Sequence, residues 1–303
     1  MWSASGRRLR ASSANPRADQ VKPPPFDYAK PASLSEALEL LASDDDAKIL
    51  AGGQSFVPVL NFRLASPSLL IDINGLAELG RISLVDGGLR LGAIVRYRDL
   101  EDSELVAAEN PLLAHALHHI AHYQIRNRGT VGGSSSHADP SAEFPAVSAL
   151  CGAEYVLQSI RGSRVLPADE FFLGALTTAL EADEILTEIR FPPWPRDRRW
   201  AFEEIAPRLG DFAILGAAVL LDPGETRILV FGAGDRASRL PRAEAALRGR
   251  TLDKAAILEA AKLASEEIEP QGDIHATAEY RKAMAEVLVE RCLERASGVK
   301  VVA

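Results

Sequence analysis

The spacing of apolar residues along the chain predicts a mixture of short strands and helices. A capping-box pattern at 33–36 precedes apolar residues that share one helical face, which predicts a helix ending near Asp44. Apolar residues alternate on both sides of Gly87-Gly88 and predict a β-hairpin. The other elements expected in this part of the chain are strands at 48–50, 69–73 and 154–158, and helices at 111–123 and just before Cys151.

A proline-rich segment at 191–195 predicts a domain boundary. Three apolar strand candidates follow it, and a run of helices then continues to about residue 296. Strands followed by helices favour an α+β arrangement over a doubly wound parallel sheet. The strands are expected at 200–205, 212–221 and 226–231, and the helices at 241–248, 252–267 and 276–296.

Composition narrows the class of protein. The chain has 303 residues, enough for two domains, and its net charge of −8 without a basic stripe argues against a nucleic-acid partner. No apolar run is long enough to span a membrane. Two cysteines, Cys151 and Cys292, cannot supply a disulfide framework, a four-cysteine zinc site or an iron–sulfur cluster. A reducing, cytoplasmic location is therefore expected.

Residues 1–21 differ from the rest of the chain. They are rich in Arg, Ser and Ala and lack the apolar stretch of a secretory signal. They predict a disordered extension, or a segment outside the native protein if translation starts at Val21. A transit peptide is a weaker alternative.

Two segments of small residues carry the strongest functional signal. Paired glycines let the backbone approach a ligand closely, and successive N–H groups can converge on phosphate oxygens. Two such segments, interpreted as loops, suit the two phosphates of a dinucleotide; two tight turns without a ligand remain the alternative, because Gly87-Gly88 lies in an ordinary turn. The segments are Ala51-Gly52-Gly53-Gln54-Ser55 and Thr130-Val131-Gly132-Gly133-Ser134.

Polar residues surround the second segment, which is expected to lie in a loop from 124 to 140. They offer groups that could reach ribose, ribityl or adenine, although the two arginines also suit a solvated loop. No catalytic triad pattern is evident, so no catalytic residue is predicted. The residues are Arg126, Arg128, His137, Asp139 and Glu143.

Residues 228–237 combine an apolar strand with the pattern G-x-G-x-x-A, as in a Rossmann site. Pro241 follows four residues later and no second strand completes a βαβ unit, so this interpretation is rejected.

Four histidines recur at helical spacing on the face opposite the apolar residues of 111–123. They predict a solvated face or a contact with a partner. A metal site is the alternative, but no carboxylate cluster accompanies it, and no metal ligand is predicted. The histidines are His115, His118, His119 and His122.

The motifs at 51–55 and 125–134, followed by His137-Ala138-Asp139-Pro140, resemble the FAD-binding medium subunit of molybdenum hydroxylases, the carbon monoxide dehydrogenase and xanthine dehydrogenase family. The resemblance extends from about residue 24 to residue 296. It includes Gly210-Asp211-Phe212 and Glu279-Tyr280-Arg281.

This resemblance implies an α+β architecture of two domains. Residues 22–195 would form a PCMH-type FAD-binding domain of the vanillyl-alcohol-oxidase kind, with two α/β subdomains at about 22–75 and 76–195. Residues 196–303 would form a domain like the C-terminal domain of CO dehydrogenase flavoproteins, with a three-stranded antiparallel sheet and helices.

The resemblance also implies roles for individual residues. The two glycine segments would grip the pyrophosphate, Glu143 or Asp139 would bind the ribityl or ribose region, and Phe212 would pack beside the isoalloxazine. Gln54 stands where the carbon monoxide enzymes have His and cannot attach flavin covalently; Ser134 stands where Asn is common. The cofactor-binding residues expected are Ala51, Gly52, Gly53, Gln54, Ser55, Thr130, Val131, Gly132, Gly133, Ser134, His137, Asp139, Glu143 and Phe212.

The function implied is electron transfer within a heterohexameric molybdenum hydroxylase. Electrons would pass from [2Fe-2S] clusters of a small subunit through non-covalent FAD to NAD, a quinone or another acceptor. Molybdopterin would lie in a large subunit. A free-standing non-covalent flavin oxidase is the main alternative, although the chain has no room for its substrate domain. A scaffold that has lost FAD is disfavoured by the intact glycines.

Overall fold

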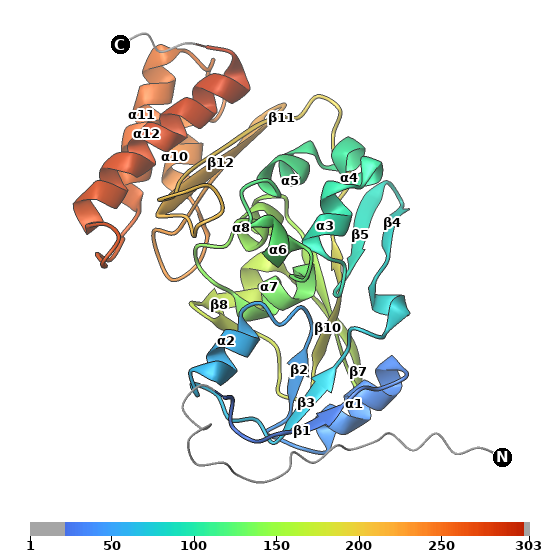
Figure 1. The fold of residues 1–303 in the computed structure, drawn as a ribbon. Helices are drawn as coiled ribbons and strands as arrows, with labels where there is room; N and C mark the ends of the chain where they lie inside the picture. The colour runs from blue at the N-terminus through green and yellow to red at the C-terminus, as the bar shows by residue number, and fades with distance from the viewer. Residues whose placement is uncertain (1–21, 300–303) are drawn as a thin grey trace, which may run out of the picture.

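A three-stranded parallel sheet forms the first subdomain of the computed structural model, which describes residues 22–299 (Figure 1). The predicted extension at 1–21 lies outside the described residues. The predicted helix is confirmed: Ser33 caps it by accepting from the N–H of Glu36, and its apolar face is buried. The elements are β1 (Asp27–Ala29), α1 (Leu34–Ala42), β2 (Lys48–Leu50), α2 (Phe56–Asn61) and β3 (Leu69–Asp72), in sheet order β1-β3-β2.

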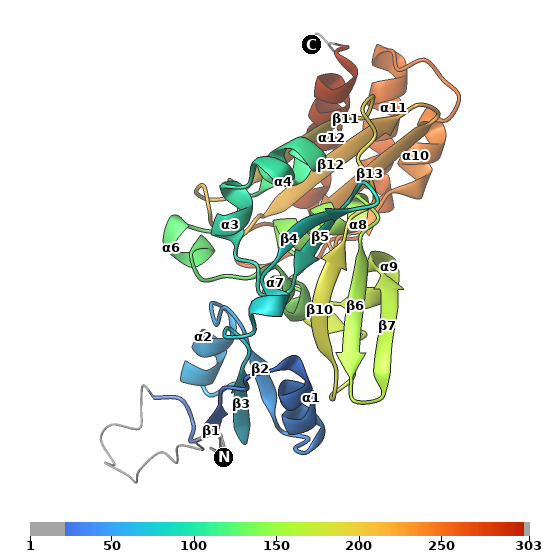
Figure 2. The ribbon, with the colours of Figure 1, turned by 90° about the vertical axis from the view of Figure 1, so that its right-hand side faces the viewer.

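The second subdomain is built on a five-stranded sheet in which every pairing is antiparallel. The expectation of two α/β subdomains is therefore right only for the first. The strand of this sheet that comes last in the sequence lies at its centre, between two earlier ones (Figure 2). The strands are β4 (Ile82–Val85), β5 (Gly88–Gly92), β10 (Ile185–Arg190), β6 (Glu154–Ser159) and β7 (Gly162–Pro167), in sheet order.

Short helices cover this sheet, and two predictions fail here. The helix expected over 111–123 ends at Ala116, before Ala121 takes a φ of +47°. The segment expected to be a loop, 124–140, contains two helices. The Thr130 side chain caps the second helix by accepting from the N–H of Gly133. The elements are η1 (Ala77–Leu79), α3 (Tyr97–Glu101), α4 (Glu104–Glu109), α5 (Pro111–Ala116), α6 (Tyr123–Arg126), α7 (Val131–His137), α8 (Glu143–Leu150), α9 (Ala168–Phe171), β8 (Phe172–Gly174) and β9 (Thr177–Thr178).

The C-terminal domain is an antiparallel sheet with three helices on one face (Figures 1 and 2). The sheet has a fourth strand of two residues in addition to the three expected. The strands are β11 (Arg199–Ile205), β12 (Leu215–Asp222), β13 (Glu225–Phe231) and β14 (Ser238–Arg239), and the helices are α10 (Pro241–Leu247), α11 (Lys254–Glu267) and α12 (Ala278–Ser297).

Both faces of the C-terminal sheet are buried. One face contributes Phe202, Leu220 and Phe231 to a core shared with the N-terminal domain. The other contributes Val219 and Val230 to a second core beneath the three helices. The two domains therefore pack against each other as one body, and this packing sets the position of a cleft between them.

Two of the four histidines lie between the domains rather than facing solvent or a partner. The ring of His115 lies 5.4 Å from that of Trp200, and the ring of His119 lies 5.0 Å from that of Phe202. Nδ1 of His119 is 3.1 Å from a carboxylate oxygen of Glu204. The prediction of a solvated face was wrong for His115 and His119, because β11 packs on them. Within residues 22–299, no group of three or more potential metal ligands is present.

Candidate functional site

A cleft of about 1690 Å³ lies where the two subdomains and the C-terminal domain meet. This volume exceeds the range of roughly 300–1,000 Å³ that is usual for small-molecule sites, so the cleft suits a large ligand. Both glycine segments line it. The predicted residues that line the cleft are Ala51, Gly52, Gly53, Gln54, Ser55, Thr130, Gly132, Gly133, Ser134, His137, Glu143 and Phe212.

The first glycine segment connects β2 to α2 and presents a row of free backbone donors. Gly53 has a φ of +73°, a conformation that glycine adopts without strain. The N–H groups of residues 52–56 make no hydrogen bond to any described residue, whereas the next one, of Val57, bonds the carbonyl of Gly53. Consecutive free N–H groups at a helix start form a typical anion-binding nest.

The second glycine segment is the first turn of α7, and its donors are already used. The N–H of Val131 donates to Val95 O, and that of Gly132 donates to Ala93 O. The N–H of Gly133 donates to Thr130 Oγ1 at 3.1 Å. The prediction of a second nest is therefore wrong in its mechanism. This segment lines the cleft as a surface without bulky side chains, while Val131 is buried in the core and does not line it.

The two segments are joined directly. A Cβ on Gly52 would lie 2.3 Å from the carbonyl oxygen of Arg128. The Arg96 guanidinium donates to that same oxygen at 2.7 Å and to Asn74 Oδ1 at 3.2 Å. Asn74 in turn donates to the carbonyl oxygen of Ala51 at 2.7 Å. Arg96 and Asn74 thus clamp the first segment against the residues that lead into the second.

The two candidate acids differ in role. Glu143 is buried at the start of α8 and lines the cleft. Its burial raises its pKa to about 8, with further contributions from the charges of Glu204 and Asp139. A protonated carboxyl at neutral pH can donate a hydrogen bond to a ligand oxygen. Asp139 does not line the cleft; its carboxylate accepts from the N–H of Ser141 at 2.8 Å and shapes the turn between the helices.

The arginines near the second segment do not line the cleft. Arg126 lies 3.0 Å from the Glu101 carboxylate and donates to the carbonyl oxygens of Ile120 and Ala121. Arg128 is exposed and contributes its backbone carbonyl to the join with Gly52. Of the two arginines, neither is placed to contact a ligand in the cleft.

In the wall that the C-terminal domain contributes, a site role was predicted from the sequence for Phe212 alone, and Gly210, Asp211 and Arg281 were named only within the resemblance. Residues 210–214, 232–236 and Arg281 line the cleft. The G-x-G-x-x-A pattern, which was rejected as a Rossmann site, forms part of this wall. β13 is antiparallel to β12, so no Rossmann unit exists there. Gly232 and Gly234 nevertheless line the cleft.

Comparisons with known proteins agree on one family. The family model of the FAD-binding domain in molybdopterin dehydrogenase matches residues 24–194, and that of the CO dehydrogenase flavoprotein C-terminal domain matches residues 200–296. The chain belongs to the FAD-binding medium subunits of molybdenum hydroxylases. It is accordingly an oxidoreductase component.

Relatives of this family cover nearly the whole chain. The nicotine 6-hydroxylase medium subunit of Paenarthrobacter nicotinovorans is 39% identical over 91% of this chain and 99% of its own length. The carbon monoxide dehydrogenase medium chain of Hydrogenophaga pseudoflava is 40% identical over 90% of this chain and 98% of its own. The structure of quinoline 2-oxidoreductase from Pseudomonas putida 86 superposes with a TM-score of 0.87 at 39% identity, covering 91% of this chain and 98% of the matched one.

The residues of the cleft fit FAD. The nest at 52–56 supplies donors for a pyrophosphate, and the Nε of Arg281, which is buried at the cleft wall, has no partner in the part of the chain that the structure describes. Gln54 donates to the carbonyl oxygen of Gly52 at 3.2 Å, which turns its amide back onto the segment. The medium subunit therefore has a row of unpaired backbone donors among its described residues at the wall of one large cleft.

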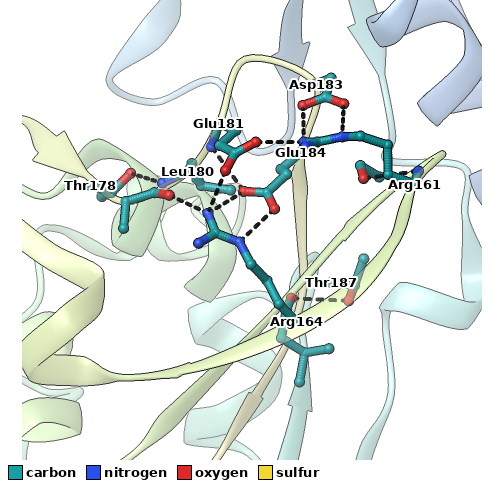
Figure 3. A network of polar contacts seen from close by, with 11 residues as sticks. Arg161, Arg164, Thr178, Leu180, Glu181, Asp183, Glu184 and Thr187 are labelled. Carbon is teal, nitrogen blue, oxygen red and sulfur yellow. Dashed lines mark hydrogen bonds and ion pairs between the residues drawn. The ribbon is translucent and has the colours of Figure 1, made fainter.

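A salt-bridge network borders the cleft at Glu184 (Figure 3). Glu184 lines the cleft, but both of its carboxylate oxygens accept from Arg164 at 2.7 Å. Burial opposes ionisation of Glu184, yet the hydrogen bonds from Arg164 and from the N–H of Glu181 leave its pKa lowered. Arg161 binds Asp183 in the same way. The Glu184 carboxylate is thus occupied by Arg164 and the N–H of Glu181, and these bonds fix the segment before β10.

Proposed function

We propose that this chain is the electron-transfer subunit of a heteromeric molybdenum hydroxylase, holding FAD non-covalently between the iron–sulfur clusters of a small partner subunit and an external acceptor. The acceptor is NAD, a quinone or another oxidant, and a large partner subunit holds molybdopterin. The observation that carries the proposal is the row of free N–H groups at 52–56, in a segment that lines a cleft of about 1690 Å³, a volume large enough for a dinucleotide.

The first glycine segment binds the pyrophosphate in this proposal. Its free amides donate to phosphate oxygens, and the N-terminal end of α2 adds a partial positive charge. The second segment acts differently: the absent side chain of Gly133 leaves room beside Ala51 in the cleft, whereas Gly132 lets α7 pack closely on Ala93. The amides of both glycines stay bonded within the protein.

Two further residues position the rest of the cofactor. Glu143 donates from its protonated carboxyl to a ribityl or ribose oxygen, which an ionised carboxylate could not do. Phe212 lines the cleft with 68% of its surface exposed, so its ring is available to pack beside the isoalloxazine. The bound flavin supplies the exchange between one-electron and two-electron carriers, and the protein supplies position and electrostatics.

We place the complex in the cytoplasm. Cys151 and Cys292 are free, buried thiols, as expected for a reducing compartment. No helix among the described residues is long and apolar enough to cross a membrane.

The test is the activity of the isolated chain. It should show a flavin spectrum and be reduced by an artificial electron donor, but oxidise no aldehyde, purine, N-heterocycle or carbon monoxide unaided. Co-expression with an iron–sulfur small subunit and a molybdenum large subunit should yield a complex that turns over. Steady oxidation of an organic substrate by the isolated chain would favour the free-standing oxidase instead.

A further inference from the structure

Arg281 occupies a junction in the C-terminal wall of the cleft. Its side chain, on the second turn of α12, is buried. Its Nη1 donates to the carbonyl oxygens of Ile214, at 2.5 Å, and Gly232. Its Nη2 donates to the Asp273 carboxylate at 2.6 Å. One guanidinium therefore binds three separate segments of the domain.

Two of these segments reach across to the N-terminal domain. The N–H of Gly232 donates to the carbonyl oxygen of Pro140 at 2.9 Å. A Cβ on Gly210, in the loop that leads to Ile214, would lie 2.7 Å from the carbonyl oxygen of Ala121. Two of the segments held by Arg281 thus line the cleft and contact the N-terminal domain, and one of them carries Phe212.

The third contact fixes the guanidinium itself. Asp273 accepts from the N–H groups of His275 and Ala276 at 2.8 and 3.0 Å. Those bonds, with a smaller contribution from Arg281, lower the pKa of Asp273 to about 2, so the carboxylate remains charged over the working pH range. The ion pair therefore orients the planar fork toward the two carbonyl oxygens.

We propose that Arg281 is a positioning residue, which holds the loop at 210–214 and the turn at Gly232 in place so that Phe212 is kept against the flavin. The flavin part of this statement rests on the function proposed above; the anchoring of the two segments does not. A lysine at this position keeps the charge near Asp273 but cannot hold two carbonyls and a carboxylate in one plane.

The first test measures hydrogen exchange in flavin-free protein. Arg281→Met should speed exchange in peptides covering 207–213 and 231–235 by roughly tenfold or more. In this variant the two segments can open locally without breaking the charge-assisted hydrogen bonds that Arg281 makes in wild type. Arg281→Lys should give a smaller increase and covers the case in which the Met variant does not fold. Lys282→Met, a change on the same helix away from the junction, should match wild type. Exchange at wild-type rates in Arg281→Lys and Arg281→Met would overturn the proposal.

The second test uses flavin-loaded protein. FAD should dissociate several times faster from the Arg281 variants than from wild type or Lys282→Met. The visible circular dichroism of the flavin should also weaken, since this signal reports how the ring is held. Faster exchange with unchanged FAD dissociation and dichroism would overturn the positioning role. If wild type binds no FAD, the proposed function fails, while the exchange measurement still decides whether Arg281 anchors the two segments.

Discussion

The carbonyl oxygen of Arg128 lies 2.3 Å from the position that a Cβ on Gly52 would occupy. No real side chain tolerates such a distance to backbone, so the first glycine segment touches the chain just before the second. Gly52 and Arg128 are 76 positions apart in the sequence, and their contact joins the two segments into one structural unit.

Gly52→Ala should therefore damage both the fold and the cofactor site. The added methyl must displace the backbone of Arg128 and Gly129, at a cost of about 1–3 kcal/mol in the free energy of unfolding. FAD content per folded chain should fall as the nest is displaced. Gly80→Ala is the control, because its Cβ would meet atoms only at ordinary distances of 3.6 Å or more. A Gly52→Ala protein with wild-type stability and full FAD would contradict the join.

Thr130→Ala should destabilise α7 by removing its N-cap. The hydroxyl accepts from the N–H of Gly133, and loss of such a cap costs about 0.5–2 kcal/mol. Thermal unfolding and FAD affinity would be compared with Thr130→Ser, which keeps the hydroxyl and should stay near wild type. Equal losses in the two variants would show that the cap is not what supports the segment.

The order of strands and helices was largely predictable, since alternation and capping signals are local. Ser33 and the apolar face of α1 are examples. The conformation of the second glycine segment was not predictable in this way. A run of glycines and serines has low helix propensity, and α7 forms because Thr130 caps it and Gly132 packs on Ala93, a residue far away in sequence.

The histidines illustrate the same limit. Their helical spacing suggested an outward face, but the element ends at Ala116, and β11 brings Trp200 and Phe202 against His115 and His119. Similarly, Asp139 was the second candidate acid after Glu143, and the sequence could not show that its carboxylate accepts from the N–H of Ser141 within the turn. Arg281 belongs to a motif of the resemblance, but its contacts with Ile214, Gly232 and Asp273 form only in the fold, so its role could not be predicted from the sequence.

Stability should depend on pH through Glu143. Its pKa is raised from 4.5 to about 8 in the folded chain, first by burial and then by the charges of Glu204 and Asp139. Between these values the folded state holds a proton that the unfolded state releases. The free energy of unfolding of flavin-free protein should therefore fall as pH rises through this window, by at most about 1.4 kcal/mol per pH unit from this group.

Glu143→Gln has no such proton to lose, so its stability should decline less between about pH 5 and pH 8 than that of wild type. Chemical denaturation at several pH values measures the two slopes. The exposed Glu170→Gln is the matched control and should follow wild type. Identical slopes in wild type and Glu143→Gln would show that Glu143 is ionised in the folded chain.

Flavin should be released completely by acid or denaturant. Gln54 stands in the first segment with its amide turned onto Gly52 and offers no nucleophile for covalent attachment. Precipitated protein should be colourless and the supernatant should contain all of the flavin. Colour retained by the unfolded chain would contradict non-covalent binding.

The identity and amount of the released flavin test the central claim most directly. Chromatography of the supernatant from purified wild-type protein should show FAD, in proportion to the chain, and neither FMN nor riboflavin, because the nest at 52–56 is suited to a pyrophosphate. Gly53→Val, which forces a branched residue into a φ of +73°, should lower that amount without unfolding the second subdomain. A wild-type chain that binds no FAD, even after incubation with it, would contradict the account.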